Sequence, residues 1–231
     1  PTGNNVDIDQ GSANVTIAAS LTKNTAGRIV EITGRTGTAT IDISGSLNCT
    51  SGCTGINVAS NTSGSTTINF SNVAKTLNTG ASAAVTLSSN AGATINFSNG
   101  GLDIDTTSGT GFNATGGGTV TVTTGANPNT INATTGAALN VTSTTIGASG
   151  LNFRSISSGA GTNNGITLDT TGANGGLTVD GDGANTSVGG NSSGGTISGK
   201  SGADGSATQG SGIYLNSTRN VVLRRMTING T

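Results

Sequence analysis

One pair of acidic residues is spaced for metal chemistry. Asp103 and Asp105 flank Ile104, so in a strand both carboxylates share one face, as two metal-binding acids would. The alternative is a solvated pair on either side of a core isoleucine. The chain contains no His, which removes the residue most often used as a general base.

A second acidic segment resembles the start of a calcium loop, where alternate carboxylate and amide oxygens converge on one ion. It reads Asp-Gly-Asp-Gly-Ala-Asn, with Asp180, Asp182 and Asn185 as the candidate ligands. The usual distal Glu is missing, and acids are common in glycine-rich turns. The sequence therefore leaves calcium open at this segment and predicts no other cofactor.

Both cysteines lie in the short segment Cys49-Thr-Ser-Gly-Cys53. Two thiols without any His do not make a zinc site. We predict a disulfide that closes this small loop, which indicates an oxidising compartment. Two free thiols are the alternative.

The composition excludes several classes of function. Lys and Arg number 9 and Asp and Glu 10, for a net charge of −1, so no broad basic surface for nucleic acid is expected. No apolar run is long enough to span a membrane. Any export signal or anchor is expected to lie outside this stretch of sequence.

An internal repeat determines the predicted fold. Thr67-Ile-Asn-Phe-Ser-Asn72 recurs as Thr94-Ile-Asn-Phe-Ser-Asn99, 27 residues later. Three sets of apolar residues keep this period, and each set predicts a column of stacked side chains. The columns are Ile41, Ile68, Ile95 and Val122; Val58, Val85, Phe112, Leu139 and Ile166; and Leu77, Ile104 and Ile131.

Each column marks a short apolar-polar-apolar strand, such as Ile41-Asp-Ile43 or Leu139-Asn-Val141. Three such strands per 27 residues, separated by Gly, Ser, Thr and Asn turns, predict an all-β, three-sided parallel β-helix. An antiparallel β-sandwich would also show frequent turns, but it does not predict a fixed 27-residue period.

The solenoid is expected to form a single domain over residues 1–231, as a segment of a longer chain. Regular turns are predicted over about 41–179, an irregular Gly/Ser-rich loop over about 180–211, and a resumed repeat over 212–230. Looser strands are expected near Val6–Ile8, Val15–Ile17 and Ile29–Ile32.

The last segment resembles a known family. Gly212-Ile-x-Leu, then Asn220-Val-x-Leu, then Met226-Thr-Ile-x-Gly is similar to one coil of the pectate-lyase-like right-handed parallel β-helix superfamily. The preceding Thr/Asn/Gly-rich repeats resemble those of bacterial surface adhesins and autotransporter passenger segments. The resemblance implies a right-handed parallel β-helix, consistent with the general rule for parallel crossovers. It does not imply one function, because this fold carries lyases, hydrolases and adhesins alike.

Polysaccharide-cleaving members of that superfamily use clustered aspartates with a His, or calcium-binding acids with an Arg or Lys. A lyase-like site could be assembled here only from Asp103 and Asp105 with a base such as Arg154. Carbohydrate clefts also offer aromatic platforms, and Tyr214 is the only Tyr in a chain without Trp. We therefore expect no enzymatic activity.

Outward residues form a further column with the same period, composed of Thr40, Thr67, Thr94 and Thr121. A flat Thr-rich face resembles the ice-binding surfaces of some β-helical antifreeze proteins. Such faces have a second Thr column two residues further along each strand. At those positions this chain has Asp42, Asn69, Asn96 and Thr123. A ladder of β-branched surface residues that stabilises stacked strands is the simpler interpretation.

Together these features predict an extracellular structural or adhesive segment of a large surface or secreted protein. Its expected partners are copies of itself or adjoining segments of the same chain, by end-to-end or lateral contact, and glycans or a host surface. The alternatives are a polysaccharide-binding or polysaccharide-cleaving module and an ice-binding or surface-binding solenoid. Arg219, Arg224 and Arg225 form the one basic cluster, either a solvated face or a phosphate or glycan site.

Overall fold

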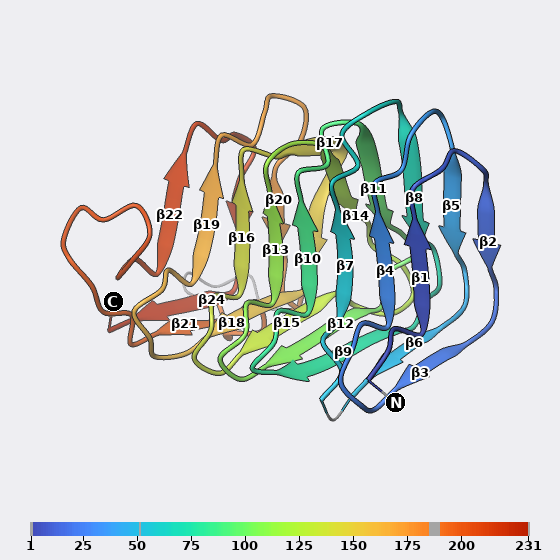
Figure 1. Cartoon of the computed structure of the whole chain (residues 1–231). Helices are drawn as coiled ribbons and strands as arrows, with labels where there is room; N and C mark the ends of the chain where they lie inside the picture. The colour runs from blue at the N-terminus through green and yellow to red at the C-terminus, as the bar shows by residue number, and fades with distance from the viewer. Residues whose placement is uncertain (1, 51, 185–189, 231) are drawn as a thin grey trace.

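The computed structural model describes residues 2–50, 52–184 and 190–230. Over these residues the chain winds through stacked turns, and each turn contributes one strand to each of three parallel sheets (Figure 1). We name these sheets A, B and C in the order in which the chain enters them. The predicted three-sided parallel β-solenoid with about 27 residues per turn is confirmed.

Sheet A faces the viewer in Figure 1. Its strands, in spatial order, are β1 (Val6–Asp9), β4 (Val30–Thr33), β7 (Ile56–Ala59), β10 (Val85–Ser88), β13 (Phe112–Thr115), β16 (Leu139–Thr142), β19 (Ile166–Asp169) and β22 (Ile213–Asn216). Sheet B contains β2 (Val15–Ile17), β5 (Thr40–Ile43), β8 (Thr66–Phe70), β11 (Ala93–Phe97), β14 (Thr119–Val122), β17 (Thr145–Phe153), β20 (Leu177–Val179) and β23 (Val222–Leu223). Sheet C contains β3 (Leu21–Lys23), β6 (Leu47–Cys49), β9 (Lys75–Gly80), β12 (Leu102–Thr106), β15 (Thr130–Ala133), β18 (Ser155–Ser158), β21 (Gly195–Ser198) and β24 (Met226–Asn229).

Side chains alternate between the core and the outer surface along each strand. In β10, Val85 and Leu87 are buried while Thr86 and Ser88 are half-buried on the outer face. The same pattern repeats from turn to turn and produces one continuous apolar core along the solenoid axis. Stability in such a stack comes from contacts between neighbouring turns.

Three phenylalanines fill the middle of this core. The rings of Phe70 and Phe97 stack with centroids 4.8 Å apart and planes 11° apart. Phe97 also meets Phe112 edge-on, at 5.6 Å. The contact connects the inner surfaces of sheets A and B, because Phe97 lies on β11 and Phe112 on β13.

Corners between sheets need residues without a side chain where successive turns approach closely. A Cβ atom at Gly101 would lie 1.9 Å from the carbonyl oxygen of Val73 in the turn before, and the φ angle of Gly101 is +72°. Only glycine fits this position without moving the backbone. Such corners account in part for the 40 glycines of the chain.

The predicted columns are correct in sheet C and in most of sheet A. Leu77, Ile104 and Ile131 pair in succession. In sheet A, Val85 pairs with Phe112, and Leu139 and Ile166 continue that column.

The prediction that Val58 precedes Val85 in that column is wrong by two residues. Val85 pairs with Ile56, and Val58 pairs with Leu87. The turn from β7 to β10 is two residues longer than the 27-residue repeat, because its corners are longer. Val85 therefore aligns with Ile56 and not with Val58, and both residues remain in the stack.

The sheet B column contains a similar error. Ile41, Ile68 and Ile95 pair as predicted, but Ile95 continues to Val120, and Val122 pairs with Phe97. Here the turn is two residues shorter than the repeat, because the glycine-rich corner before β14 is compact. All these residues still point inward and are buried.

The segment predicted as an irregular loop over 180–211 contains a strand. Residues Gly195–Ser198 form β21, which pairs with β18 and β24 in sheet C. The only large apolar residue of this short strand is Ile197. The looser strands expected near Val6, Val15 and Ile29 are present as β1, β2 and β4.

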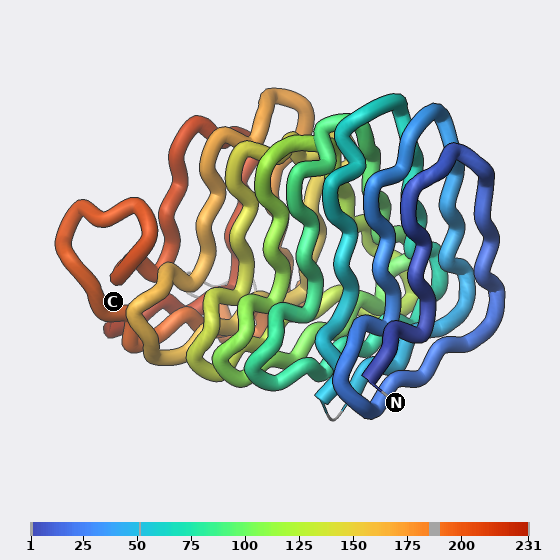
Figure 2. Tube along the Cα trace, in the orientation of Figure 1, coloured from blue at the N-terminus to red at the C-terminus, as the bar shows by residue number. Residues whose placement is uncertain are grey.

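The two ends of the described chain lie at opposite ends of the stack (Figure 2). The loop between β21 and β22 projects beside the C-terminal turn in the same view. Within the described ranges, no helix is long and apolar enough to cross a membrane.

Candidate functional site

A lysine interrupts the apolar core between sheets B and C. Lys75 begins β9 and takes the inward position between Leu47 and Leu102 of the neighbouring turns. Its side chain is buried. The Nζ atom donates hydrogen bonds to the carbonyl oxygens of Gly100 at 2.6 Å, Ser98 at 3.0 Å and Asn72.

Burial lowers the pKa of Lys75 from 10.5 to about 8. The three carbonyl oxygens meet all three N–H donors of the ammonium group. Lys75 is thus a structural group that connects one corner with the next, and its position leaves no face open to a ligand.

Buried asparagines connect turns at the corner between sheets A and B. The Nδ2 atom of Asn61 donates to Oδ1 of Asn90 at 2.8 Å, and Nδ2 of Asn90 donates to the carbonyl oxygen of Val58 at 2.8 Å. The backbone N–H of Arg35 donates to Oδ1 of Asn61 at 2.8 Å. These bonds satisfy corner backbone groups that adjoining strands do not reach.

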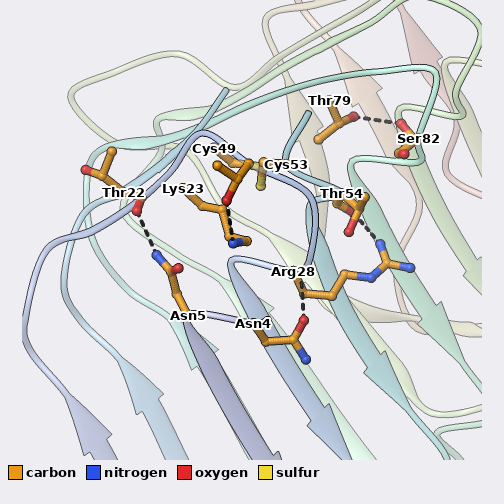
Figure 3. Close-up of a disulfide and its surroundings, with 11 residues drawn as sticks. Asn4, Asn5, Thr22, Lys23, Arg28, Cys49, Cys53, Thr54, Thr79 and Ser82 are labelled. Carbon is orange, nitrogen blue, oxygen red and sulfur yellow. Dashed lines mark hydrogen bonds between the residues drawn. A yellow bond between two sulfur atoms is a disulfide. The ribbon is translucent and has the colours of Figure 1, made fainter. Parts of the chain in front are cut away.

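The structure contains the predicted disulfide between Cys49 and Cys53, with 5.5 Å between their Cα atoms (Figure 3). Both residues are fully buried. Cys49 ends β6 and stacks between Lys23 and Leu77 in sheet C. The bond therefore closes the corner between sheets C and A.

The Thr column on sheet B is aligned over three turns. Thr40 pairs with Thr67, and Thr67 with Thr94. The predicted fourth member, Thr121, is wrong because Thr94 pairs with Thr119. The same two-residue shift that moves Val122 moves this position.

Thr121 instead belongs to the neighbouring outward column, where the sequence had placed Thr123. Its Oγ1 donates to Oδ1 of Asn96 at 2.8 Å, and Nδ2 of Asn96 donates to Oδ1 of Asn69 at 3.0 Å. These bonds run along the solenoid axis and favour a stabilising surface ladder over a uniform Thr face.

Asp103 and Asp105 share the outer face of β12, as predicted, but one oxygen of each carboxylate accepts a hydrogen bond from the next turn. Oδ1 of Asp103 accepts a hydrogen bond from Thr130 at 2.6 Å, and Oδ1 of Asp105 accepts one from Asn132 at 3.1 Å. Arg154 lies just before β18, two turns away from β12. The structure therefore does not bring the three residues together.

The predicted calcium ligands also have other partners. Asp180 lies 2.9 Å from Arg224 and 3.6 Å from Arg225. The oxygens of Asp182 accept hydrogen bonds from Ala184, Asn191 and Ser193, and these bonds lower its pKa.

Asn185, the third predicted calcium ligand, lies outside the described residues. Over the described ranges, no group of three or more His, Cys, Asp or Glu side chains is arranged to hold a metal ion.

Two adjoining hollows follow the corner between sheets B and C. One, of about 260 Å³, contains Arg154 and Asp180 in its lining, and the other, of about 290 Å³, contains Asp103. Asn127 and Pro128 line both hollows and separate them. Arg224 and Arg225, two of the three residues in the predicted basic cluster, are engaged with Asp180 at this corner, while Arg219 is exposed beyond β22.

A third hollow of about 340 Å³ lies on the outer face of sheet A. Its floor consists of outward side chains of β13, β16 and β19, and its wall includes Ala207 and Thr208 of the loop between β21 and β22. We call it the sheet A trough. Its lining combines the hydroxyl and amide groups of Thr and Asn side chains with methyl groups of Thr and Ala.

The loop that forms this wall is fixed by the buried side chain of Asn164. Its Nδ2 donates to the carbonyl oxygen of Ala207 at 2.9 Å, and its Oδ1 accepts from the backbone N–H of Ser211 at 2.9 Å. Gly210 adds a backbone bond to Thr162 at 3.0 Å.

Sequence reasoning missed Lys75, the buried asparagines and the trough. Asn61 and Asn90 follow the aligned residues Ile56 and Val85 by the same number of residues, a signal that was available once the alignment of β7 with β10 was known. The trough had no local signal, because a loop distant in sequence supplies its wall.

The chain matches no family model, no curated protein and no solved structure in the comparisons made.

Proposed function

We propose that this chain is an extracellular structural or adhesive β-solenoid segment of a large surface or secreted protein, in which it acts as a stalk, scaffold or fibre-forming element. The observation that carries the proposal is the continuity of the stack. Core, side-chain ladders and parallel backbone pairing all run along one axis, so the length of such a body can grow by adding turns.

Polar ladders on the outside support a role as a scaffold. The Asn69–Asn96–Thr121 ladder on sheet B, for example, joins three successive turns by side-chain bonds. Such bonds resist separation of turns and give the surface regularly spaced amides and hydroxyls. The predicted secreted location is supported by the disulfide, because such bonds persist in oxidising compartments.

The terminal strands support end-to-end contact. In the last turn, Leu215 and Ile228 are 46% and 48% exposed. In the first turn, Val6 and Ile8 of β1 are only partly buried. Such apolar edges would suit stacking on an adjoining segment or on a second molecule.

Polysaccharide binding is the second candidate function, and the sheet A trough is the observation that favours it. Polysaccharide cleavage has weaker support, since Arg154 lies two turns away from Asp103 and Asp105. An ice-binding or surface-binding face would rest on the aligned Thr40, Thr67 and Thr94 alone.

Bead retention combined with product analysis tests the proposal. Beads coated with the protein are passed over glycan-coated, protein-coated and uncoated surfaces under flow, with beads carrying an unrelated globular protein of similar net charge as the control. The same glycans are incubated with the protein in solution and assayed for new reducing ends and unsaturated products. Selective retention without product supports an adhesive scaffold, and catalytic turnover of any glycan would contradict the proposal.

A further inference from the structure

The floor of the sheet A trough consists of outward side chains from successive strands. Two outward columns cross it along the solenoid axis. One continues through Asn113, Asn140, Thr167 and Tyr214. The other continues through Thr115, Thr142, Asp169 and Asn216.

Tyr214 places an aromatic ring one strand beyond the floor of the trough, next to its lining. It is the only Tyr of the chain, it pairs with Thr167 of the trough floor, and it is half-exposed on the outer face of β22. A ring at that position contributes nothing to the core inside the solenoid. The accessible part of the ring offers a rigid apolar face with a hydroxyl at its edge, which suits stacking against a sugar ring.

Hydrogen-bonding capacity remains on the floor beside the ring. Asn140 uses one N–H on Asn113 at 2.7 Å, which leaves its second N–H as a donor. Thr167 accepts from Asn164 at 3.2 Å and keeps its own O–H as a donor.

Asp169 supplies the complementary acceptor. Its Oδ1 accepts from Asn216 and from Thr170, each at 2.8 Å, while its Oδ2 takes no hydrogen bond from the described residues. A sugar with two adjacent hydroxyls could donate from one to Asp169 Oδ2 and accept on the other from Asn140 or Thr167.

The spacing of the turns suits a polymer. Successive strands of a sheet lie about 4.8 Å apart, roughly the length of one hexose unit in an extended polysaccharide. Asn140, Thr167 and Tyr214 occupy one column on three successive strands. A chain that runs along the solenoid axis could therefore place one sugar unit over each of these strands.

The charge of the lining favours a neutral polymer. Asp169 is the one charged side chain among the described lining residues. Nearby Lys200 is buried and donates to Asn163 at 2.9 Å, so it does not counter that charge on the outer surface. A phosphate or uronate would meet a carboxylate with no cation beside it.

We propose that the sheet A trough binds a neutral polysaccharide whose chain runs along the solenoid axis, with one sugar stacked on Tyr214 and a neighbouring hydroxyl pair held by Asp169 and Asn140. The proposal deepens the adhesive part of the proposed function and rests on it.

Native affinity electrophoresis tests the proposal. The full chain is run through gels that contain one soluble neutral polysaccharide each, from a panel of β-glucan, galactomannan, mannan, neutral xylan and dextran, and through a gel that contains polygalacturonate. We expect retardation by at least one neutral polymer and none by polygalacturonate. With the retarding polymer, Tyr214→Ala should weaken binding about tenfold and Asp169→Asn about fivefold or more.

Two matched variants control for general surface effects. Tyr214→Phe keeps the stacking ring and should bind nearly as wild type does. Asp105→Asn removes an outward acid on sheet C, outside the trough, and should leave binding unchanged. All four substitutions are on outward side chains, so equal thermal midpoints would show that the variants fold.

The proposal is overturned if no neutral polymer in the panel retards the chain, if polygalacturonate alone does so, or if Tyr214→Ala and Asp169→Asn bind as wild type does. Bead retention separates this failure from failure of the proposed function. Tyr214→Ala beads that still adhere would place adhesion elsewhere on the molecule. Wild-type beads that adhere to no surface would remove the adhesive role itself.

Discussion

Replacing Lys75 by Met should change how the stability of the solenoid depends on pH. In the folded chain, burial lowers the pKa of this lysine from 10.5 to about 8. Between these two pH values the unfolded state binds more protons than the folded state. The free energy of unfolding of the wild-type protein should therefore rise as the pH rises through this window, and level off above it.

The shift in pKa sets the size of the rise. A fall from 10.5 to about 8 corresponds to about 3 kcal/mol if burial acts alone. This figure is an upper bound, because the carbonyl oxygens of Asn72, Ser98 and Gly100 favour the ammonium form and solvent screens part of the burial penalty. We therefore expect a rise of about 1–2 kcal/mol.

Urea unfolding at four pH values across the window measures this rise. Lys75→Met removes the titrating group and keeps a stem of similar length in the core, so the variant should lose the rise attributed to Lys75. Burial also lowers the pKa of Lys200, so Lys200→Met is the control that removes the other buried contribution. Equal pH dependence of unfolding in wild type and Lys75→Met would refute the account of this site.

Three further perturbations test the interior. Phe97→Ala removes a ring stacked at 4.8 Å and should cost about 3–5 kcal/mol by urea unfolding, whereas a cost below that of Phe97→Leu would contradict the packing. Asn90→Ala removes the hydrogen bonds that the buried Asn90 side chain makes with Asn61 and with the carbonyl oxygen of Val58 and should cost about 2–3 kcal/mol, while Asn96→Ala on the outer face should cost much less. Thiol titration of the native, unreduced protein should detect no reactive thiol, because Cys49 and Cys53 are bonded. Reduction should cost about 2 kcal/mol, and two thiols in the native protein would disprove the bond.

The fold could be predicted from the sequence because a parallel solenoid repeats its apolar pattern at an almost constant step. Ile41, Ile68 and Ile95 keep the 27-residue period and pair in the structure. The disulfide was also predictable, since a short segment contains both cysteines.

The partner of each residue in the neighbouring strand was harder to predict. Corner lengths vary, but the same side chains still point into the core. A two-residue difference in a corner keeps the alternation of faces, so Val58 and Val122 remain buried although each aligns with a different partner. Strand β21 escaped notice because one large apolar residue, Ile197, marks it.

The candidate site was the least predictable part. Tyr214 stood out as the only Tyr, but its neighbour Thr167 comes from the turn before. The wall of the trough depends on Asn164 holding a loop more than forty residues later in the chain. Such contacts depend on three-dimensional proximity that no local pattern encodes.

We propose that the chain binds glycans and does not cleave them. The most direct measurement follows binding and chain cleavage together, in the same samples, for the protein mixed with neutral polysaccharides and with polygalacturonate plus calcium. We predict that protein is recovered with a neutral polymer, while new reducing ends and unsaturated products stay at the level of the protein-free sample. Products that increase in proportion to the protein, and disappear in the Asp103→Asn, Asp105→Asn double variant, would contradict the account.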